Sequence, residues 1–198
     1  MSKTLKHELK ADSLLDTGMA LLWSKGYNAT SVNDIVKAAD IPKGSFYFYF
    51  DSKEDFAVKA IEKYFTVQFT PAQEILQNKL VSPKQRLLDF YEFRCNVLKN
   101  EMDCKMGCMA SNLGNEMAEH SEKIRNIILS KEQFVLSMIT EVIQEAQDFN
   151  EIDTTMEAAD LAAFIEDAGK GGMISMKEMK SAYPIDNFLN MVRKILLK

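Results

Sequence analysis

The chain has 198 residues, 46% of them hydrophobic and 27% charged, an ordinary globular balance with room for one large or two small domains. It has no run of about 18 apolar residues, which excludes a membrane span, and its polar N-terminus is not typical of a signal peptide. Three cysteines without an export signal are expected to be reduced thiols in the cytoplasm.

The charges are unevenly distributed along the chain. Residues 1–65 carry nine Lys, no Arg and nine Asp or Glu, so this part is neutral, and the formal net charge of -5 resides in residues 66–198. A neutral head does not by itself favour nucleic-acid binding. If the head binds DNA, its guanine contacts must come from Lys or be absent, and the affinity should depend strongly on salt.

Residues 30–60 have the pattern of a helix-turn-helix. Four apolar residues lie at i, i+3, i+4 and i+7, which predicts one short amphipathic helix; they are Val32, Ile35, Val36 and Ala39. Asp40 lies where the chain must turn, and Asp tolerates a left-handed conformation better than most other non-glycine residues. Pro42 then suits the first turn of a second helix, where its missing N–H costs nothing.

These residues, with the segments 26–32, 43–50 and 52–54, resemble the TetR family of bacterial one-component repressors over roughly the first 65 residues. Asp40 departs from the family's usual Gly. The resemblance implies an all-α fold with a three-helix DNA-binding domain at residues 1–52. It also implies a helical effector-binding and dimerisation domain at residues 53–198.

In such a motif the second helix enters the major groove of DNA, so its side chains reach base edges and phosphates. The expected contacts from this helix are Lys43, Gly44, Ser45, Tyr47 and Tyr49. The expected phosphate contacts beside it are Thr30, Ser31 and Lys53.

The rest of the chain is expected to be helical, with no strand. Gly26 should end the first helix, Ser52 should cap a long helix with a break at Pro71, and Pro83 should open the next. Further helices are expected over residues 104–119, 121–148, 154–180 and 185–197. The resemblance implies that the last two pair with a second copy in a four-helix bundle. Their apolar seam would contain Ala158, Leu161, Ala162, Ile165, Phe188, Met191, Val192 and Ile195.

Residues 106–118 and 170–177 resemble effector-domain helices of the NemR- and AcuR-like branch, whose members often respond to reactive electrophiles or small unsaturated metabolites. This implies an effector site at Cys108, Met109, Asn112, Phe134 and Lys177. A reactive Cys108 needs a nearby cation, for which Lys105 and Lys177 are the candidates. The alternative is a buried, inert Cys108 beside a reversibly bound apolar ligand. Cys104 is expected one turn before Cys108 on the same helix face, without partners for a metal site.

The sequence therefore predicts a ligand-responsive transcriptional repressor that binds a palindromic operator in double-stranded DNA as a homodimer and is released by a small molecule or a reactive electrophile. No cofactor, metal or membrane partner is expected. One alternative is a helical ligand-binding protein without sequence-specific DNA binding, which the neutral head favours. An enzyme is not expected, since Cys108 has no catalytic signature and two His residues leave few acid–base groups near neutral pH.

Overall fold

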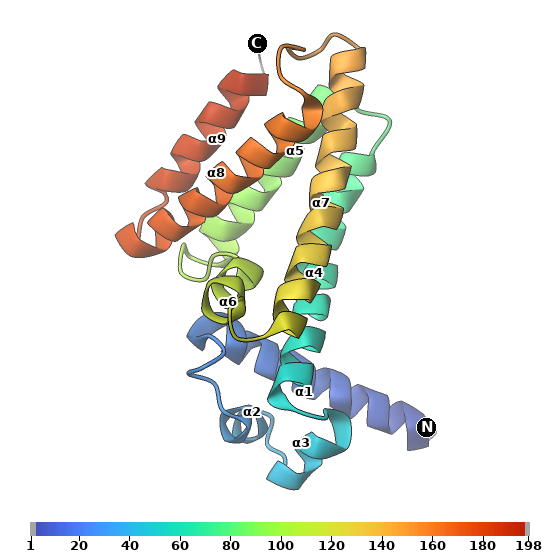
Figure 1. Cartoon of the computed structure of the whole chain (residues 1–198), viewed down its shortest axis with the longest axis vertical. Coiled ribbons are helices and arrows are strands. Elements are labelled where there is room, and N and C mark those ends of the chain that lie inside the picture. Colours follow the sequence, from blue (N-terminus) through green and yellow to red (C-terminus); the bar gives the residue numbers. More distant parts are fainter. Residues whose placement is uncertain (1–2, 197–198) are drawn as a thin grey trace. The chain divides into compact units, whose positions relative to one another are not determined.

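The computed structural model describes residues 3–196, with side chains from residue 10 onward, and over that range it is all-α, as predicted. The helices are α1 (Lys3–Lys25), α2 (Val32–Ala38), α3 (Lys43–Tyr49), α4 (Lys53–Gln77), α5 (Pro83–Asn96), a π-helical turn (Val97–Glu101), α6 (Met109–Met117), α7 (Glu122–Asp148), α8 (Ala158–Met179) and α9 (Tyr183–Leu196) (Figure 1). None of the helices within residues 3–196 combines the length and apolar composition that a membrane span needs.

The chain forms two compact units. Unit 1 comprises Met1–Thr66 and Met109–Ser130, and unit 2 comprises Val67–Cys108 and Lys131–Lys198. The predicted boundary after residue 52 divides the chain once, whereas in the structure α6 and the start of α7 group with the N-terminal helices. The long helices α4 and α7 contribute residues to both units.

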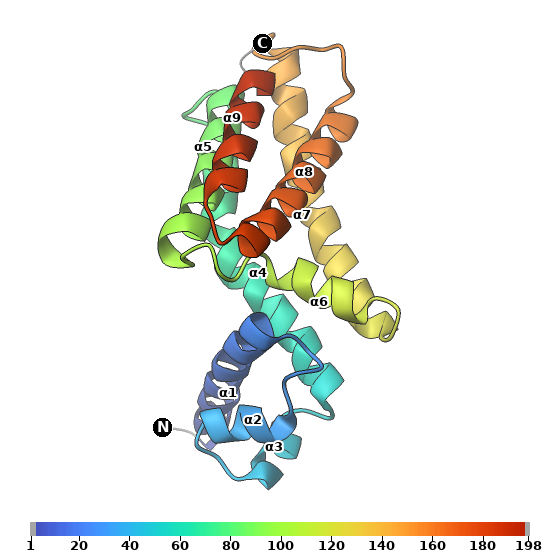
Figure 2. The ribbon, with the colours of Figure 1, turned by 90° about the vertical axis from the view of Figure 1, so that its left-hand side faces the viewer.

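Unit 1 has a small core between its N-terminal helices, and α2 and α3 lie side by side in both views (Figures 1 and 2). The buried side chains that the three N-terminal helices and α4 share are Leu14, Leu22, Ile35, Phe46, Phe50 and Phe56. Gly18 allows α1 to approach this core, since a Cβ there would lie 2.9 Å from Ile35 Cγ2 and would overlap the Phe56 ring. Close packing of this kind determines how the short helices are oriented.

Unit 2 contains α5, α8 and α9, with α8 and α9 side by side in both views (Figures 1 and 2). Its buried apolar residues include Leu87, Phe90, Leu161, Ile165 and Leu189. The rings of Tyr91 on α5 and Phe188 on α9 meet edge to face, with centroids 5.9 Å apart.

The predicted break at Pro71 is wrong, because α4 continues through this residue. A proline inside a helix removes the hydrogen bond to the carbonyl four residues earlier, here that of Val67. Pro71 is exposed and Val67 is 49% exposed, so water can bind that carbonyl. The helix is also packed just beyond the proline, where Ala72 and Leu76 are each 1% exposed.

The predicted helix over residues 104–119 begins later, at Met109. Asp103 and Cys104 both have left-handed backbones, with φ of 48° and 56°. Gly107 is also left-handed, with φ of 62°. A helix cannot run through such residues, so Cys104 precedes α6 and does not share a helix face with Cys108. The Gly171–Gly172 pair lies inside α8.

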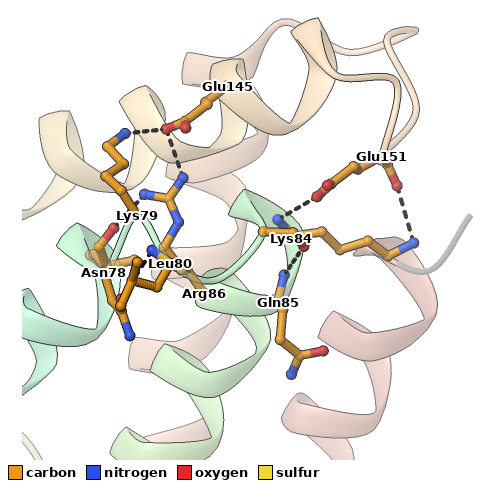
Figure 3. Close-up of polar contacts among 10 residues, drawn as sticks. Asn78, Lys79, Leu80, Lys84, Gln85, Arg86, Glu145 and Glu151 are labelled. Carbon is orange, nitrogen blue, oxygen red and sulfur yellow. Dashed lines mark hydrogen bonds and ion pairs between the residues drawn. The ribbon is translucent and has the colours of Figure 1, made fainter.

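The turn between α4 and α5 is held by a buried arginine (Figure 3). Arg86 is 1% exposed, its Nη1 donates to Leu76 O at 2.7 Å, and its Nη2 lies 2.7 Å from Glu145 Oε2 on α7. Lys79 reaches the same carboxylate oxygen from the turn. Hydrogen bonds from Lys79 and Arg86 lower the pKa of Glu145. Lys84 binds Glu151 through its backbone N–H and its ammonium group, so two hydrogen bonds join the start of α5 to the segment that follows α7.

The glycine at position 18 should be required by packing. Replacing Gly18 by Ala should lower the free energy of unfolding by roughly 1–3 kcal/mol, because the added methyl overpacks the core against Ile35 and Phe56. Gly44→Ala is the matched control, since no heavy atom lies within 4 Å of a Cβ at that position. This second change should raise stability by roughly 0.5–1 kcal/mol through helix propensity. Urea unfolding of both variants tests the pair, and a Gly18→Ala protein as stable as the wild type would contradict the packing argument.

Glu145 should make stability depend on pH. Its folded-state pKa is lowered, so its contribution is present above the unfolded pKa of about 4.3 and is lost as pH falls through the folded value. Glu145→Gln should therefore be less stable than the wild type at neutral pH, and the difference should shrink as pH falls from about 5 to 3. Unfolding measured across this range decides the question, and a difference that stays constant would exclude the linkage.

Candidate DNA-binding surface and effector site

Local hydrogen bonds fix both the start of α2 and the turn between α2 and α3. Ser31 Oγ accepts from Asp34 N at 3.1 Å, and Asp34 Oδ2 accepts from Ser31 N at 2.8 Å, forming a capping box at the start of α2. Asp40 follows α2 with φ of 52°, which confirms the predicted left-handed turn. Ile41 N then donates to Val36 O at 3.0 Å, and the chain enters α3.

α3 has one buried aromatic face and one exposed aromatic face. The ring centroids of Phe46 and Phe50 are 5.4 Å apart, and both rings pack on Phe56, at 5.5 and 4.8 Å. In contrast, Tyr47 is 56% exposed and Phe48 is 70% exposed. Phe48 was not among the predicted contacts. The i, i+4 spacing of Phe46 and Phe50 could have revealed it, because a face occupied by those two residues leaves positions 47 and 48 outside the core.

The start of α3 is open. Lys43 and Gly44 are exposed, while Ser45 and Tyr49 are partly exposed on the same helix. A glycine within a helix costs about 0.5–1 kcal/mol relative to alanine. At Gly44 no neighbouring atom of the protein requires it, since a Cβ there would meet nothing within 4 Å. The internal packing of unit 1 therefore does not explain this glycine.

The three residues predicted to bind phosphates differ in how exposed they are and in what their side chains bind. Ser31 is exposed. Thr30 is fully buried and its Oγ1 donates to Gly26 O at 2.7 Å, so in this conformation its hydroxyl cannot reach a phosphate. Lys53 Nζ donates to Tyr27 O at 3.0 Å and to Thr30 O at 3.1 Å, and burial lowers the pKa of this ammonium group. Thr30 and Lys53 thus hold the α1–α2 turn together, which the sequence pattern did not show.

Cys108 lies in unit 2, at the end of the segment that leads into α6. Its side chain is partly exposed, as is that of Cys104, whereas Cys95 is buried. Burial raises the pKa of the Cys95 thiol to about 11, so Cys95 is an inert core residue. Within residues 3–196 no cluster of three or more His, Cys, Asp or Glu residues could hold a metal ion.

Two cations other than Lys105 lie near the Cys108 segment. Lys105 is exposed and paired with Asp103 at 2.5 Å, and this ion pair raises the pKa of Lys105. Lys177 lies over the backbone of Gly107, since a Cβ at Gly107 would be 3.1 Å from Lys177 Cδ. Arg94 Nη1 is 2.7 Å from Glu166 Oε1.

Arg94 and Cys108 are close enough to interact electrostatically. Burial would lower the pKa of Arg94, but Glu166 raises it, with smaller contributions from Tyr91 and Cys108. The guanidinium is therefore a permanent positive charge within electrostatic range of the Cys108 sulfur. Sequence reasoning missed both Arg94 and Glu166, because they are 72 residues apart and only the fold joins them.

The remaining predicted effector residues divide between the two units. Phe134 is in unit 2, is 50% exposed and meets the Phe69 ring with centroids 6.2 Å apart. Met109 and Asn112 are in α6, which belongs to unit 1; Met109 is fully buried there and Asn112 is partly buried. Unit 2 by itself therefore contains Cys108, Phe134 and Lys177.

An apolar groove lies between α8 and α9. The large apolar side chains that line it and are exposed are Phe164, Met179, Tyr183 and Met191. Most of the seam predicted from spacing is instead buried within the chain: Ala158, Leu161, Ala162, Ile165 and Val192 are at most 4% exposed. Because α8 has two apolar stripes, helical spacing alone did not show which one packs internally and which one stays open.

Known proteins resemble this chain over its whole length. The family described as "Bacterial regulatory proteins, tetR family" matches residues 14–60, and the one described as "Tetracyclin repressor-like, C-terminal domain" matches residues 83–192. The first match contains the helix-turn-helix, and the second contains the Cys108 segment and most of the α8–α9 groove.

Among curated relatives, the HTH-type transcriptional repressor DhaR of Mycobacterium sp. is 28% identical over 184 residues, covering 93% of this chain and 90% of DhaR. The HTH-type transcriptional repressor NemR of Escherichia coli is 26% identical over 196 residues, covering 99% and 98%. The crystal structure of regulatory protein TetR from Rhodobacter sphaeroides superimposes with a TM-score of 0.86 at 27% identity, covering 94% of this chain and 98% of that one.

Proposed function

The chain belongs to the TetR family of bacterial regulatory proteins, and on that premise we propose that it is a ligand-responsive transcriptional repressor. It binds a palindromic operator as a homodimer in the cytoplasm, where bacterial DNA lies, and a small molecule or reactive electrophile releases it. The observation that carries this proposal is the outward face of α3, where Tyr47 and Phe48 are exposed on a helix anchored by buried Phe46. Its named relatives are repressors, which argues against an enzyme.

The exposed groups of α3 suit a major groove. The Lys43 ammonium can bind phosphate or guanine, and the Tyr47 hydroxyl can hydrogen-bond to either. The Phe48 ring has no polar atom and is suited to the methyl group of thymine. Gly44, which the protein's own packing does not require, lets the α3 backbone approach the DNA. Ser31, Ser45 and Tyr49 complete the proposed contacts, whereas Thr30 and Lys53 support them from behind.

The groove between α8 and α9 is the proposed dimer interface. Exposed aromatic and Met side chains on two adjacent helices form an apolar surface that a second copy can cover. Two copies present two recognition helices to one DNA face, where half-sites recur every ~34–36 Å. Since both half-sites must fit together, a small change in their separation weakens both.

The proposed response begins at Cys108. The thiol is partly exposed, the Lys177 side chain packs against the neighbouring Gly107, and Arg94 interacts with Cys108 electrostatically. A cation near a thiol favours the nucleophilic thiolate. The second candidate is a reversible apolar effector, which the half-exposed ring of Phe134 favours. In both cases unit 2 receives the signal.

The first prediction concerns Tyr47. Tyr47→Ala should weaken operator binding by ~1–3 kcal/mol, roughly 5- to 150-fold, because it removes a base or phosphate contact. Phe149→Ala is the matched control, since Phe149 is 63% exposed but lies in unit 2. Fluorescence anisotropy at fixed salt, with an operator selected from random duplex DNA, measures both.

Gly44→Ala tests the same face of α3 with a variant that should be more stable than the wild type. It should nevertheless weaken operator binding. A folded Tyr47→Ala protein with unchanged affinity would remove Tyr47 from the interface.

The dimer interface can be tested separately. The double variant Phe164→Asp, Met191→Asp should dissociate into monomers, since each carboxylate would be buried without a partner at the interface. Ile174→Asp is the control, because Ile174 is 44% exposed on α8 but does not line the groove. Analytical ultracentrifugation reports the assembly state. If the double variant sediments as the wild type does, the interface lies elsewhere.

The Cys108 prediction separates covalent from reversible sensing. N-ethylmaleimide should release wild-type protein from its operator and leave Cys108→Ser bound, because only the wild type gains bulk beside Gly107 and Lys177. Cys104→Ser serves as the control and should be released like the wild type. Anisotropy and intact mass are read on the same samples. Equal release of wild type and Cys108→Ser would favour the reversible apolar effector.

A further inference from the structure

Glu116, near the end of α6, binds the turn between α1 and α2. Its Oε2 accepts a hydrogen bond from Tyr27 N at 2.7 Å, and its Oε1 accepts one from Asn28 N at 2.6 Å. All three residues belong to unit 1. Hydrogen bonds from backbone N–H groups to a carboxylate are charge-assisted and short, and two parallel bonds also fix direction. A single side chain of α6 therefore determines where this turn lies.

Gly26 makes this contact possible. Its φ is 86°, a left-handed conformation that side chains rarely adopt. A Cβ at this position would lie 2.7 Å from Glu116 Oε2, too close for the carboxylate to stay in place. The glycine thus serves both the backbone of the turn and the approach of Glu116.

Lys53, the first residue of α4, holds the other side of the same turn. Glu116 binds the N–H of Tyr27, while Lys53 Nζ binds the carbonyl of Tyr27 at 3.0 Å and lies 4.0 Å from the centre of its ring. Burial lowers the pKa of Lys53, and the charge of Glu116 opposes this effect. The α1–α2 turn is therefore held between an anion from α6 and a cation from α4.

The turn leads directly into the helix-turn-helix. Buried Thr30 ends it, and Ser31 caps α2, which precedes α3. At its other end, α6 begins at Met109, the residue after Cys108. A helix is a stiff element with a rise of about 1.5 Å per residue. A movement of α6 that lengthened both Glu116 bonds by about 1 Å would take them beyond hydrogen-bonding range.

We propose that Glu116 couples α6 to the DNA-binding head: it is a positioning residue that holds the α1–α2 turn in the operator-binding arrangement and lets go when a change at Cys108 shifts α6. This inference rests on the proposed function and deepens it. Coupling between two sites is reciprocal. If modification of Cys108 weakens operator binding, bound operator disfavours the modified protein by the same factor. We therefore expect bound operator to slow the alkylation of Cys108 as well.

The test compares wild type, Glu116→Gln and Glu119→Gln. The amide at position 116 keeps the shape but directs an NH2 group at one of the two N–H donors. Glu119 is an exposed carboxylate three residues further on, so its variant controls for the loss of charge. The readout is the rate at which iodoacetamide alkylates Cys108, followed by peptide mass, with and without saturating operator. Operator should slow alkylation by about fivefold or more in wild type and Glu119→Gln, and the effect should disappear in Glu116→Gln.

A purely structural role would shift the melting temperature of Glu116→Gln but leave the operator effect on Cys108 intact, and that result would overturn the inference. Operator binding without any effect on wild-type Cys108 would do the same, as would equal loss in Glu119→Gln. Each of these outcomes leaves the repressor function standing. Failure of all three proteins to bind operator would instead remove the proposed function, and the coupling with it.

If Glu116→Gln does not fold, the inference is tested instead by measuring hydrogen exchange of backbone amides in the wild-type protein. The amides of Tyr27 and Asn28 should be protected, and alkylation of Cys108 should speed their exchange by about fivefold or more. Unchanged exchange at both amides after alkylation would overturn the inference.

Discussion

The packing of Phe46 and Phe50 against Phe56 is the interaction on which the candidate DNA-binding surface depends. α3 has only seven residues, too few for a stable helix in isolation. Burial of one aromatic face stabilises it and at the same time decides which residues face outward. Gly18 contributes by letting α1 approach the Phe56 ring. The exposure of Tyr47 and Phe48 is thus a consequence of the core. A short helix held by the two buried rings of Phe46 and Phe50 cannot rotate.

The same logic extends to the α1–α2 turn. A turn of this kind has backbone N–H and C=O groups that no helix satisfies. In unit 1 these groups are bound by side chains from distant helices, with Glu116 binding N–H groups and Lys53 binding carbonyls. Satisfying the turn in this way makes its position depend on α6 and α4. A structural requirement of the backbone therefore becomes a means of transmitting displacement.

Unit 2 combines a rigid frame with a partly exposed thiol. Buried Arg86 and its partner Glu145 fix the α4–α5 turn, and Arg94 with Glu166 joins α5 to α8. Such pairs are costly to break, because each partner alone would be a poorly solvated charge. Cys108 lies beside this frame at the end of a segment with three left-handed residues. A packed interior responds to added volume by shifting whole elements, which suits a sensor.

The sequence by itself determined the features that depend on neighbouring residues. The helical segments followed from apolar spacing, and the left-handed turn after α2 followed from the place of Asp40. These features involve residues within about four positions of each other, where backbone geometry allows few alternatives.

Only the tertiary structure decided which side chains distant residues would bind. It buried Thr30, turned Lys53 inward, kept α4 helical through Pro71 and delayed the start of α6. It also chose which apolar stripe of α8 is exposed. Partners such as Glu116 and Tyr27 are 89 residues apart, and no local pattern encodes their contact, because it exists only once separate helices have packed around a common core.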